Sequence, residues 1–225
     1  MMFNKPQLQA FLLTIIAGLA DAVGYVAMGG VFAANMTGNT VLAGLALGDG
    51  QLDLAAKRLA PLGTFFAGAM LARLLLRLFH RPAVPLLIEA ALLAVIGFLP
   101  VGRESALLLV ALAMGLQASA ITHFDGTAVS TVVVTSTLAR IADAMLDRIW
   151  PATGRALPSI ATPRLLALTW IGYLAGAIAG VLLIRATAWP LLVPAALLLV
   201  VTFQMSRAMR QQKPESPSGA PRPGL

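Results

Sequence analysis

The sequence predicts an all-α integral membrane protein with about six transmembrane helices, and composition and patterning lead to that fold class. Apolar residues make up 59% of the 225 residues and charged residues only 11%, whereas a soluble domain carries about 25% charge. The apolar residues are gathered into long runs that charges or prolines bound. A spanning helix needs about 20 apolar residues, so the chain has room for roughly six to eight spans.

Six of the apolar runs are long enough to be full spanning helices. They cover residues 8–29, 59–79, 84–99, 106–124, 165–184 and 189–205. Two further stretches, 30–48 and 126–146, carry Asn, Thr and Ser in their centres. A continuous helix of this polarity would not face lipid comfortably. We therefore expect two broken or re-entrant segments, each an extended strand followed by a half-helix, although an eight-span arrangement stays open.

The distribution of positive charge predicts the topology. The net charge is +7, and its basic residues lie singly in loops and at the ends of the apolar runs, which indicates a membrane surface and not nucleic acid as the partner. Both the six-span and the eight-span arrangement place 12 of the 16 Lys and Arg residues with the two termini. We expect both termini in the cytoplasm, a single transmembrane domain over 1–207, and a disordered, basic, Pro-rich cytoplasmic tail over 208–225.

Self-similarity predicts an internal repeat, with one copy at about 8–100 and the other at about 104–206. Gly18-Leu19 recurs 97 residues later as Gly115-Leu116, and Gly68-Ala69 recurs 108 residues later as Gly176-Ala177. A polar break follows the first helix of both copies. Three full helices per copy would make the repeats inverted, as in many transporters, and four would make them parallel.

The two breaks carry the candidate binding residues. Asn, Thr and Ser are preferred caps at a helix start, and a half-helix that begins inside the membrane leaves free N–H groups that a polar solute or anion can satisfy. The alternative is that these side chains only cap helices. The predicted substrate-binding residues are Asp21, Asn35, Thr37, Asn39, Thr40, Gln117, Thr135, Ser136 and Thr137.

Asp21 is the carboxylate deep within a strongly apolar run. Such a group is costly in lipid, so it should face the bundle interior. Two roles are open: coupling to a proton or cation, and a structural hydrogen bond to the neighbouring break. Gln117 stands at the matching face of the second copy, one position before the equivalent of Asp21.

No cofactor, metal site or enzymatic activity is expected. The absence of cysteine excludes disulfides and thiol chemistry, and no known nucleophile, zinc or nucleotide-binding motif is present. His123 and Asp125 are two potential ligands without a third, which favours an interfacial pair.

Small residues at four-residue spacing predict close helix packing. Gly172, Gly176 and Gly180 form one such stripe, and Thr64, Gly68 and Ala72 form another. Because they occupy equivalent positions in the two copies, we read them as packing faces between the repeats. A homodimer through Gly172, Gly176 and Gly180 is the alternative.

A longer motif resembles a known family. The segment 18–25, GLADAVGY, followed by Gly30-Val31-Phe32 and by 35–41, NMTGNTV, resembles the signature of the YoaK-type family, domain of unknown function 1275. The resemblance implies a bacterial inner-membrane protein with six spans and no settled activity. Where the family tends to have Thr-Gly-Thr in the second break, this chain has Thr135-Ser136-Thr137.

The leading functional hypothesis is a small transporter or channel-like permease for a small polar or anionic solute, with a midplane site at the two half-helix starts. One rival is a non-transporting module that assists assembly or binds a partner through its small-residue stripes. A third, less favoured reading is an intramembrane enzyme that uses Asp21 or His123. The sequence does not identify the solute or a coupling ion.

Overall fold

The computed structural model describes residues 4–124, 127–128, 135–150 and 161–211, and these are almost entirely helical. The apolar runs form helices for the reason given above, and each helix ends near a proline, glycine or charge. The helices are α1 Lys5–Ala27, α2 Met36–Gly48, α3 Leu52–Phe79, α4 Ala83–Phe98, α5 Arg103–Ala120, α6 Thr135–Ile149, α7 Ala161–Ala186 and α8 Leu192–Gln211. Three of them contain segments long and apolar enough to cross a membrane, namely Lys5–Ala27, Leu52–Phe79 and Pro163–Ala186.

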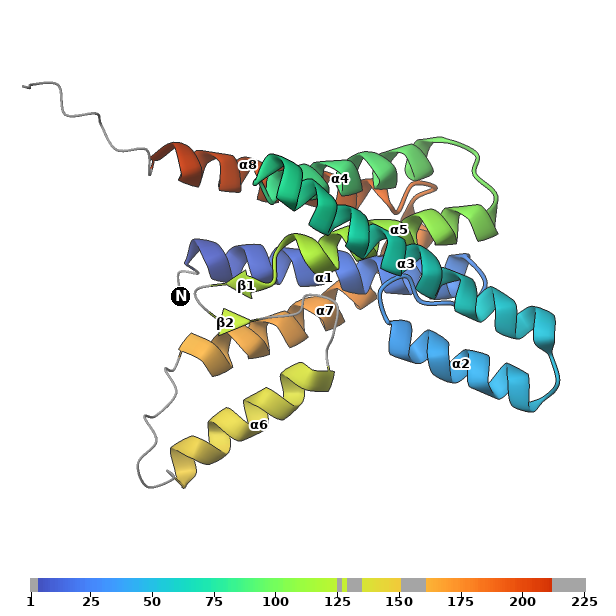
Figure 1. Ribbon diagram of the computed structural model, residues 1–225, viewed down its shortest axis with the longest axis horizontal. Helices are drawn as coiled ribbons and strands as arrows, with labels where there is room; N and C mark the ends of the chain where they lie inside the picture. The colour runs from blue at the N-terminus through green and yellow to red at the C-terminus, as the bar shows by residue number, and fades with distance from the viewer. Residues whose placement is uncertain (1–3, 125–126, 129–134, 151–160, 212–225) are drawn as a thin grey trace, which may run out of the picture.

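Six helices lie along one common axis, and the chain reverses direction from each of them to the next (Figure 1). These are α1, α3, α4, α5, α7 and α8. The two others, α2 and α6, flare outward at opposite ends of the bundle, α2 beside α3 and α6 beside α7. The start of α1 and the end of α8 lie at the same end of the bundle.

Two crossed pairs of helices form the centre, α1 with α7 and α3 with α5. Glycine makes both contacts close. A Cβ on Gly18 of α1 would overlap the carbonyl oxygen of Tyr173 on α7, and a Cβ on Gly115 of α5 would overlap that of Phe65 on α3. Any side chain at these two positions would therefore force the helices apart.

The glycine stripe of α7 is used within the chain. Gly172, Gly176 and Gly180 meet the backbone of α1 at Phe11, Ile15 and Leu19. These contacts agree with a packing role for the stripe. Association of two chains through the same glycines is a separate prediction that a single chain does not test.

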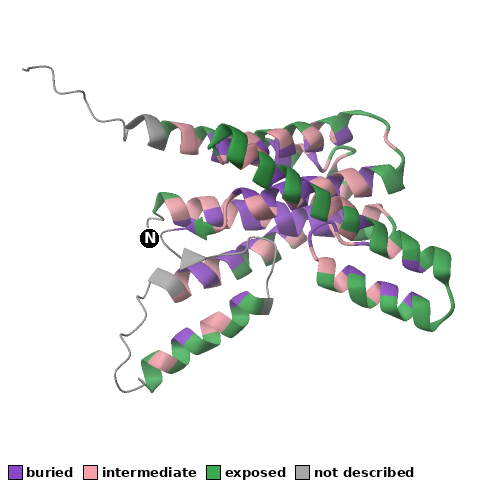
Figure 2. Cartoon of the chain, in the orientation of Figure 1, coloured by how far each residue is buried: buried purple, intermediate pink, exposed green. Residues whose placement is uncertain are grey.

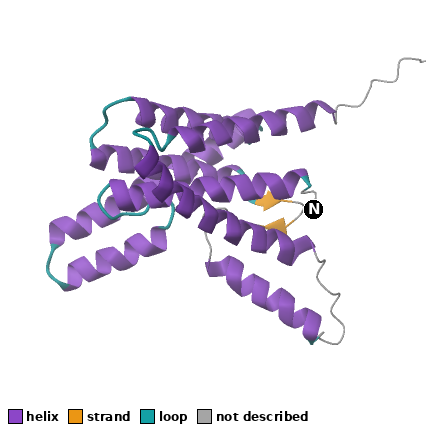
Figure 3. Cartoon of the chain, turned by 180° about the vertical axis from the view of Figure 1, so that it is seen from behind, coloured by secondary structure: helices purple, strands orange, loops and turns teal. Residues whose placement is uncertain are grey.

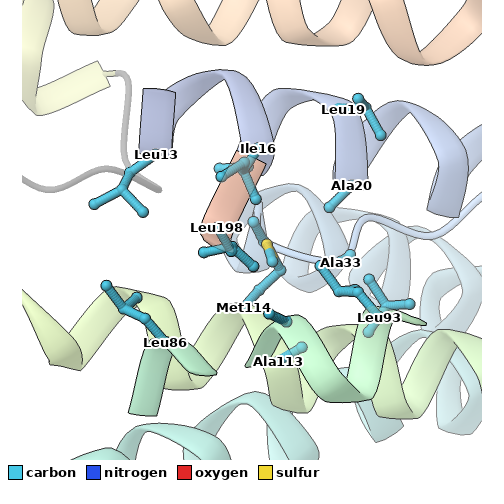
Figure 4. Close-up of a cluster of buried hydrophobic side chains, with 14 of the residues drawn as sticks. Leu13, Ile16, Leu19, Ala20, Ala33, Leu86, Leu93, Ala113, Met114 and Leu198 are labelled. Atoms are coloured by element: carbon cyan, nitrogen blue, oxygen red, sulfur yellow. The ribbon is translucent and has the colours of Figure 1, made fainter. Parts of the chain in front are cut away.

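Burial falls from the centre of the bundle outward (Figure 2). In the most apolar stretch of α1, 67% of the residues are buried, compared with 17% in α3 and 22% in α7. Leu13 and Ile16 of α1 share one apolar cluster with Met114 of α5 and Leu198 of α8 (Figure 4). Many large apolar side chains on the outward faces of the helices are exposed, Phe66 of α3 and Leu182 of α7 among them, as expected of surfaces that face lipid.

The structure corrects the predicted end of the fourth apolar run. The helix was expected to extend through residue 124, but α5 ends at Ala120 because the β-branched Ile121 and Thr122 take up a more extended backbone. A short hairpin follows, in which β1 (His123–Phe124) pairs antiparallel with β2 (Thr127–Ala128), as Figure 3 shows. At the other end of the chain, α8 extends to Gln211, past the predicted end at 205. The first residues of the predicted tail, 208–225, therefore belong to α8, and those from 212 onward lie outside the described residues.

Candidate functional site

The first polar break folds back along the helix that precedes it. After α1 ends at Ala27, Gly29 and Gly30 have φ of 100° and 70°, a conformation that only glycine adopts without strain. The Arg58 guanidinium on α3 donates hydrogen bonds to the carbonyl oxygens of both glycines. The chain then returns beside α1, where Gly24 leaves room for the carbonyl of Val31.

Asp21 holds the returning chain in place. It is 3% exposed, and its Oδ1 accepts the backbone N–H of Ala34 at 2.5 Å and that of Asn35 at 3.2 Å. Its Oδ2 accepts the hydroxyl of Tyr173 from α7. Two roles were open for Asp21, ion coupling and a structural hydrogen bond to the break. The structure shows the hydrogen bond. The carboxylate joins α1, the break and α7.

Asn39 stabilises the same segment from the other side. Its side chain is fully buried, its Oδ1 accepts the N–H of Phe32 at 2.9 Å, and its Nδ2 donates to the Phe32 carbonyl at 2.8 Å. The Asn39 amide thus makes with the Phe32 backbone the two hydrogen bonds that a residue of a neighbouring strand would make. The Phe32 ring is stacked on Tyr25, with 4.8 Å between ring centroids, and covers Gly38.

These side-chain bonds explain why the predicted strand is absent from the first break. Residues 31–35 form no strand, because the N–H groups of Phe32, Ala34 and Asn35 are bonded to side chains and not to another strand. The half-helix of the break begins at Met36. The prediction of an extended strand was wrong here, and the prediction of a helix start inside apolar sequence was right.

The remaining candidates of the first break serve the start of α2. Asn35 is the helix cap: its Oδ1 accepts the N–H of Gly38 at 3.1 Å and the hydroxyl of Thr37 at 2.8 Å. Thr37 and Thr40 lie within the first turns, and the Thr40 hydroxyl bonds the carbonyl of Met36. Side chains of the break therefore satisfy part of the helix start, as the capping alternative predicts.

The second break is only partly described. Residues 129–134 and the side chain of Thr135 lie outside the described residues; Ser136 is exposed and Thr137 is buried on α6. Gln117 of α5 is fully buried and donates to the Leu13 carbonyl of α1 at 2.9 Å. The structure thus brings together Asp21, Asn35 and Asn39, and places Gln117 on a different contact, between α5 and α1.

A pocket of about 250 Å³ opens beside the first break, and the sequence reading had missed its charged residues. Lys57 and Glu104 form an ion pair at 2.6 Å between α3 and α5, and Arg58 lies next to them. All three belong to the first turns of their helices, so the pocket lies toward the end of the bundle away from the termini. No local pattern could have found it, because the pairing joins residues 47 positions apart. Its lining residues are Met28, Gly29, Val31, Leu54, Lys57, Arg58, Ala60, Glu104, Leu107 and Leu108.

The other predicted chemical pair is not assembled in the described part of the chain. His123 contacts the hydroxyl of Thr122 through Nδ1 at 3.0 Å, and Asp125 lies outside the described residues. Among residues 4–124, 127–128, 135–150 and 161–211, no three His, Asp or Glu side chains are grouped so that they could hold a metal ion.

Comparison with known proteins agrees with the architecture. No solved structure is significantly similar to the chain. The UPF0700 transmembrane protein YoaK of Bacillus subtilis (strain 168) is 32% identical over 150 residues, which cover 62% of this chain and 67% of that protein. Residues 9–204 match the family described as Protein of unknown function (DUF1275). With this match across most of its length, the chain belongs to the DUF1275 family of membrane proteins.

Proposed function

We propose that the protein is a small permease of the bacterial inner membrane that moves a small anionic solute. The observation that carries the proposal is the first break: a buried non-helical segment held against α1, followed by the half-helix α2 and lying beside a pocket with two cationic side chains. Non-helical backbone at membrane depth is tolerated where it is buried in protein or lines a water-filled cavity. Broken helices of this kind form the solute sites of many transporters.

Six spans with both termini in the cytoplasm suit the arrangement of the helices. The six helices along the common axis alternate in direction, and the two chain ends lie together (Figure 1). In this topology α2 is re-entrant: the chain leaves α1, returns beside it as far as Asn35, and goes back outward as α2. The half-helix α6 lies beside α7 at the opposite end of the bundle, and we assign it the equivalent re-entrant role.

Two inverted repeats of three full helices explain the symmetry of the contacts. Gly18 and Gly115 are separated by 97 residues, and they meet equivalent carbonyls, of Tyr173 and Phe65, which are separated by 108. The helices α1 and α5 run in opposite directions (Figure 1). Both observations support an inverted repeat, which is the arrangement that lets a permease open alternately to its two sides.

The charges of the pocket favour an anion as the solute. Lys57 and Arg58 contribute two positive charges against the single negative charge of Glu104, and the apolar walls exclude large hydrated ions. We place the solute first against Lys57, at the outer end of the break. Asp21 and Asn39 hold the backbone of the break and Asn35 caps α2, while Thr37, Thr40 and the second-break residues Thr135, Ser136 and Thr137 are the remaining residues of the predicted substrate site.

Flux into liposomes tests the proposal. Purified protein should accelerate the uptake of at least one member of a panel of small anions, and Lys57→Gln should lower that uptake about tenfold, because an anion loses a charge-assisted contact. Arg103→Gln, which removes a positive charge at the same end but outside the pocket lining, is the matched control. If correctly folded wild-type protein moves no member of the panel, the proposal fails and the partner-binding alternative takes its place.

A further inference from the structure

A second acidic side chain is buried in the bundle, and it differs from Asp21. Glu89 on α4 is 0% exposed, and neither Oε1 nor Oε2 has a hydrogen-bond partner in the part of the chain that the structure describes. Buried polar groups nearly always have a partner. A carboxyl that holds no structural bond needs another explanation, and inside a membrane the default explanation is function.

The position of Glu89 directs it to the protein interior and not to lipid. Leu86 and Leu93, three residues before it and four residues after it, share its face of α4 and are fully buried. Both belong to the apolar cluster that also holds Met114 of α5 and Leu198 of α8 (Figure 4). Glu89 therefore belongs to the face of α4 that packs against the rest of the bundle.

Packing does not require a carboxyl at this position, as α8 demonstrates. Glu89 is the fourth residue after Pro85 of α4, and Leu198 is the fourth residue after Pro194 of α8. The two helices pack against each other, and both residues are fully buried. Leucine lies at the same distance after a proline in α8, so a buried position of this kind can be filled by an apolar side chain.

Among the described residues, the helices packed against α4 place no charged partner on Glu89. Polar side chains within these helices are already bonded elsewhere, Gln117 to the Leu13 carbonyl and Thr202 to the Leu199 carbonyl. Among the charged residues of the three neighbouring helices, Arg58 of α3 is partly buried and bonded to Gly29 and Gly30. The others lie in end turns or on exposed faces, namely Asp53, Lys57, Arg73 and Arg77 on α3, Arg103 and Glu104 on α5, and Arg207 and Arg210 on α8.

We propose that Glu89 is a proton-exchange site, which binds a proton while α4 is packed against α8 and releases it when the two helices part. The proton is the class of ligand that fits, because the described residues group no further acid or histidine with this carboxyl, and a single carboxyl is too poor a site to hold a metal cation. This inference rests on the proposed permease function: the proton carried by Glu89 would cross the membrane with the solute. It also makes a claim about Glu89 that does not depend on any solute.

Carbodiimide labelling tests that claim directly. Dicyclohexylcarbodiimide partitions into membranes and reacts with protonated carboxyls: the acid oxygen bonds to the central carbon, the proton moves to nitrogen, and rearrangement leaves a stable N-acylurea. In liposomes of phosphatidylcholine and phosphatidylglycerol, we expect the adduct on the peptide that contains Glu89, with less adduct as the pH rises. Glu89→Gln should abolish the adduct, whereas Asp49→Asn, at an exposed carboxyl, should leave it unchanged. If Glu89 is labelled only after the protein is denatured, it is permanently sealed and the proposal is overturned.

Transport under an imposed pH gradient tests the coupling. If the wild-type flux is stimulated by the gradient, Glu89→Gln should lose that stimulation, and Asp49→Asn should keep it. Stimulation that survives in Glu89→Gln overturns the coupling. If wild-type protein moves no solute at all, the permease function and the coupling fail together, and the labelling result alone decides whether Glu89 exchanges protons.

Discussion

The two halves of the bundle, α1–α4 and α5–α8, share a packing scheme and differ in chemistry. Gly18 and Gly115 make equivalent close crossings. Among the described residues, however, the two buried acids, Asp21 and Glu89, both lie in the first half. Position 118, which is 97 residues after Asp21, is alanine, and Leu198 lies the same distance after Pro194 as Glu89 does after Pro85. The described part of the second half thus has the same close crossing without a buried acid, and the proton site that we propose belongs to the first half.

The largest expected effect tests the shared packing. Gly18→Leu and Gly115→Leu should each prevent folding, because a side chain at either position collides with backbone that cannot give way. The fraction of monodisperse protein in detergent, followed by size-exclusion chromatography, measures this. Gly63→Ala, at a glycine with open space around its Cβ position, is the control and should fold normally. A well-folded Gly115→Leu protein would show that the two crossings are not equivalent.

The next effect tests the chemical difference at the first break. Asp21→Ala should destabilise the protein by about 3 kcal/mol, because two buried N–H groups and the Tyr173 hydroxyl lose their acceptor. Asp21→Asn keeps one acceptor oxygen and should cost less. Thermal unfolding in detergent, read by tryptophan fluorescence, distinguishes the two. Equal midpoints for Asp21→Ala and the wild type would contradict the structural role of this carboxylate.

Asn39 should show a smaller effect, confined to the break. Asn39→Leu removes both hydrogen bonds to Phe32 and should cost about 2 kcal/mol. Because the native chain has no cysteine, Ala33→Cys can report local opening: the residue is buried, so maleimide should label it slowly until Asn39→Leu is added. A cysteine at the exposed Val41 should be labelled at the same rate in both backgrounds. An unchanged rate at residue 33 would mean that Asn39 does not hold the break.

A substitution of Glu89 should raise the stability of the protein, whereas the substitutions above lower it. Glu89→Leu, which copies the α8 counterpart, should stabilise the protein by about 1 kcal/mol, because it replaces an unpartnered buried acid by an apolar side chain. The thermal midpoint measures the change. A large loss of stability would indicate that the Glu89 carboxyl makes a structural hydrogen bond. An apolar side chain would then not suit this position in α4 as it does in α8.

The smallest expected effect separates function from stability at the pocket. Lys57 and Glu104 are 61% and 74% exposed, and exposed ion pairs contribute little. Lys57→Gln should leave the thermal midpoint unchanged while it lowers anion uptake. Arg58→Gln should lower the midpoint, since it also releases the carbonyls of Gly29 and Gly30.

Local patterns predicted most of the helices and few of the contacts. The apolar runs and their bounding charges located the six long helices to within a few residues at most ends, and the glycine spacing indicated which faces pack closely. The strand expected at Val31 was wrong because side chains, Asp21 and Asn39, took the place of a neighbouring strand. The hydroxyl that Asp21 binds and the ion pair of the pocket come from distant helices, and such pairings leave no mark on the local sequence.

The hydrogen bond between Asp21 and Tyr173 also sets an order of events during synthesis. The two residues are 152 positions apart, so at about 5–20 residues per second the ribosome needs roughly 8–30 s to supply the hydroxyl after it has made the carboxylate. During that interval, α1 carries an incompletely bonded acid in the nascent chain. The first break is therefore completed late, after α7 has emerged, although the chain that forms it is made early. In chains truncated before α7, Asp21 would keep lacking the Tyr173 hydroxyl. Quality-control proteases could recognise such incompletely assembled chains by this unpaired acid.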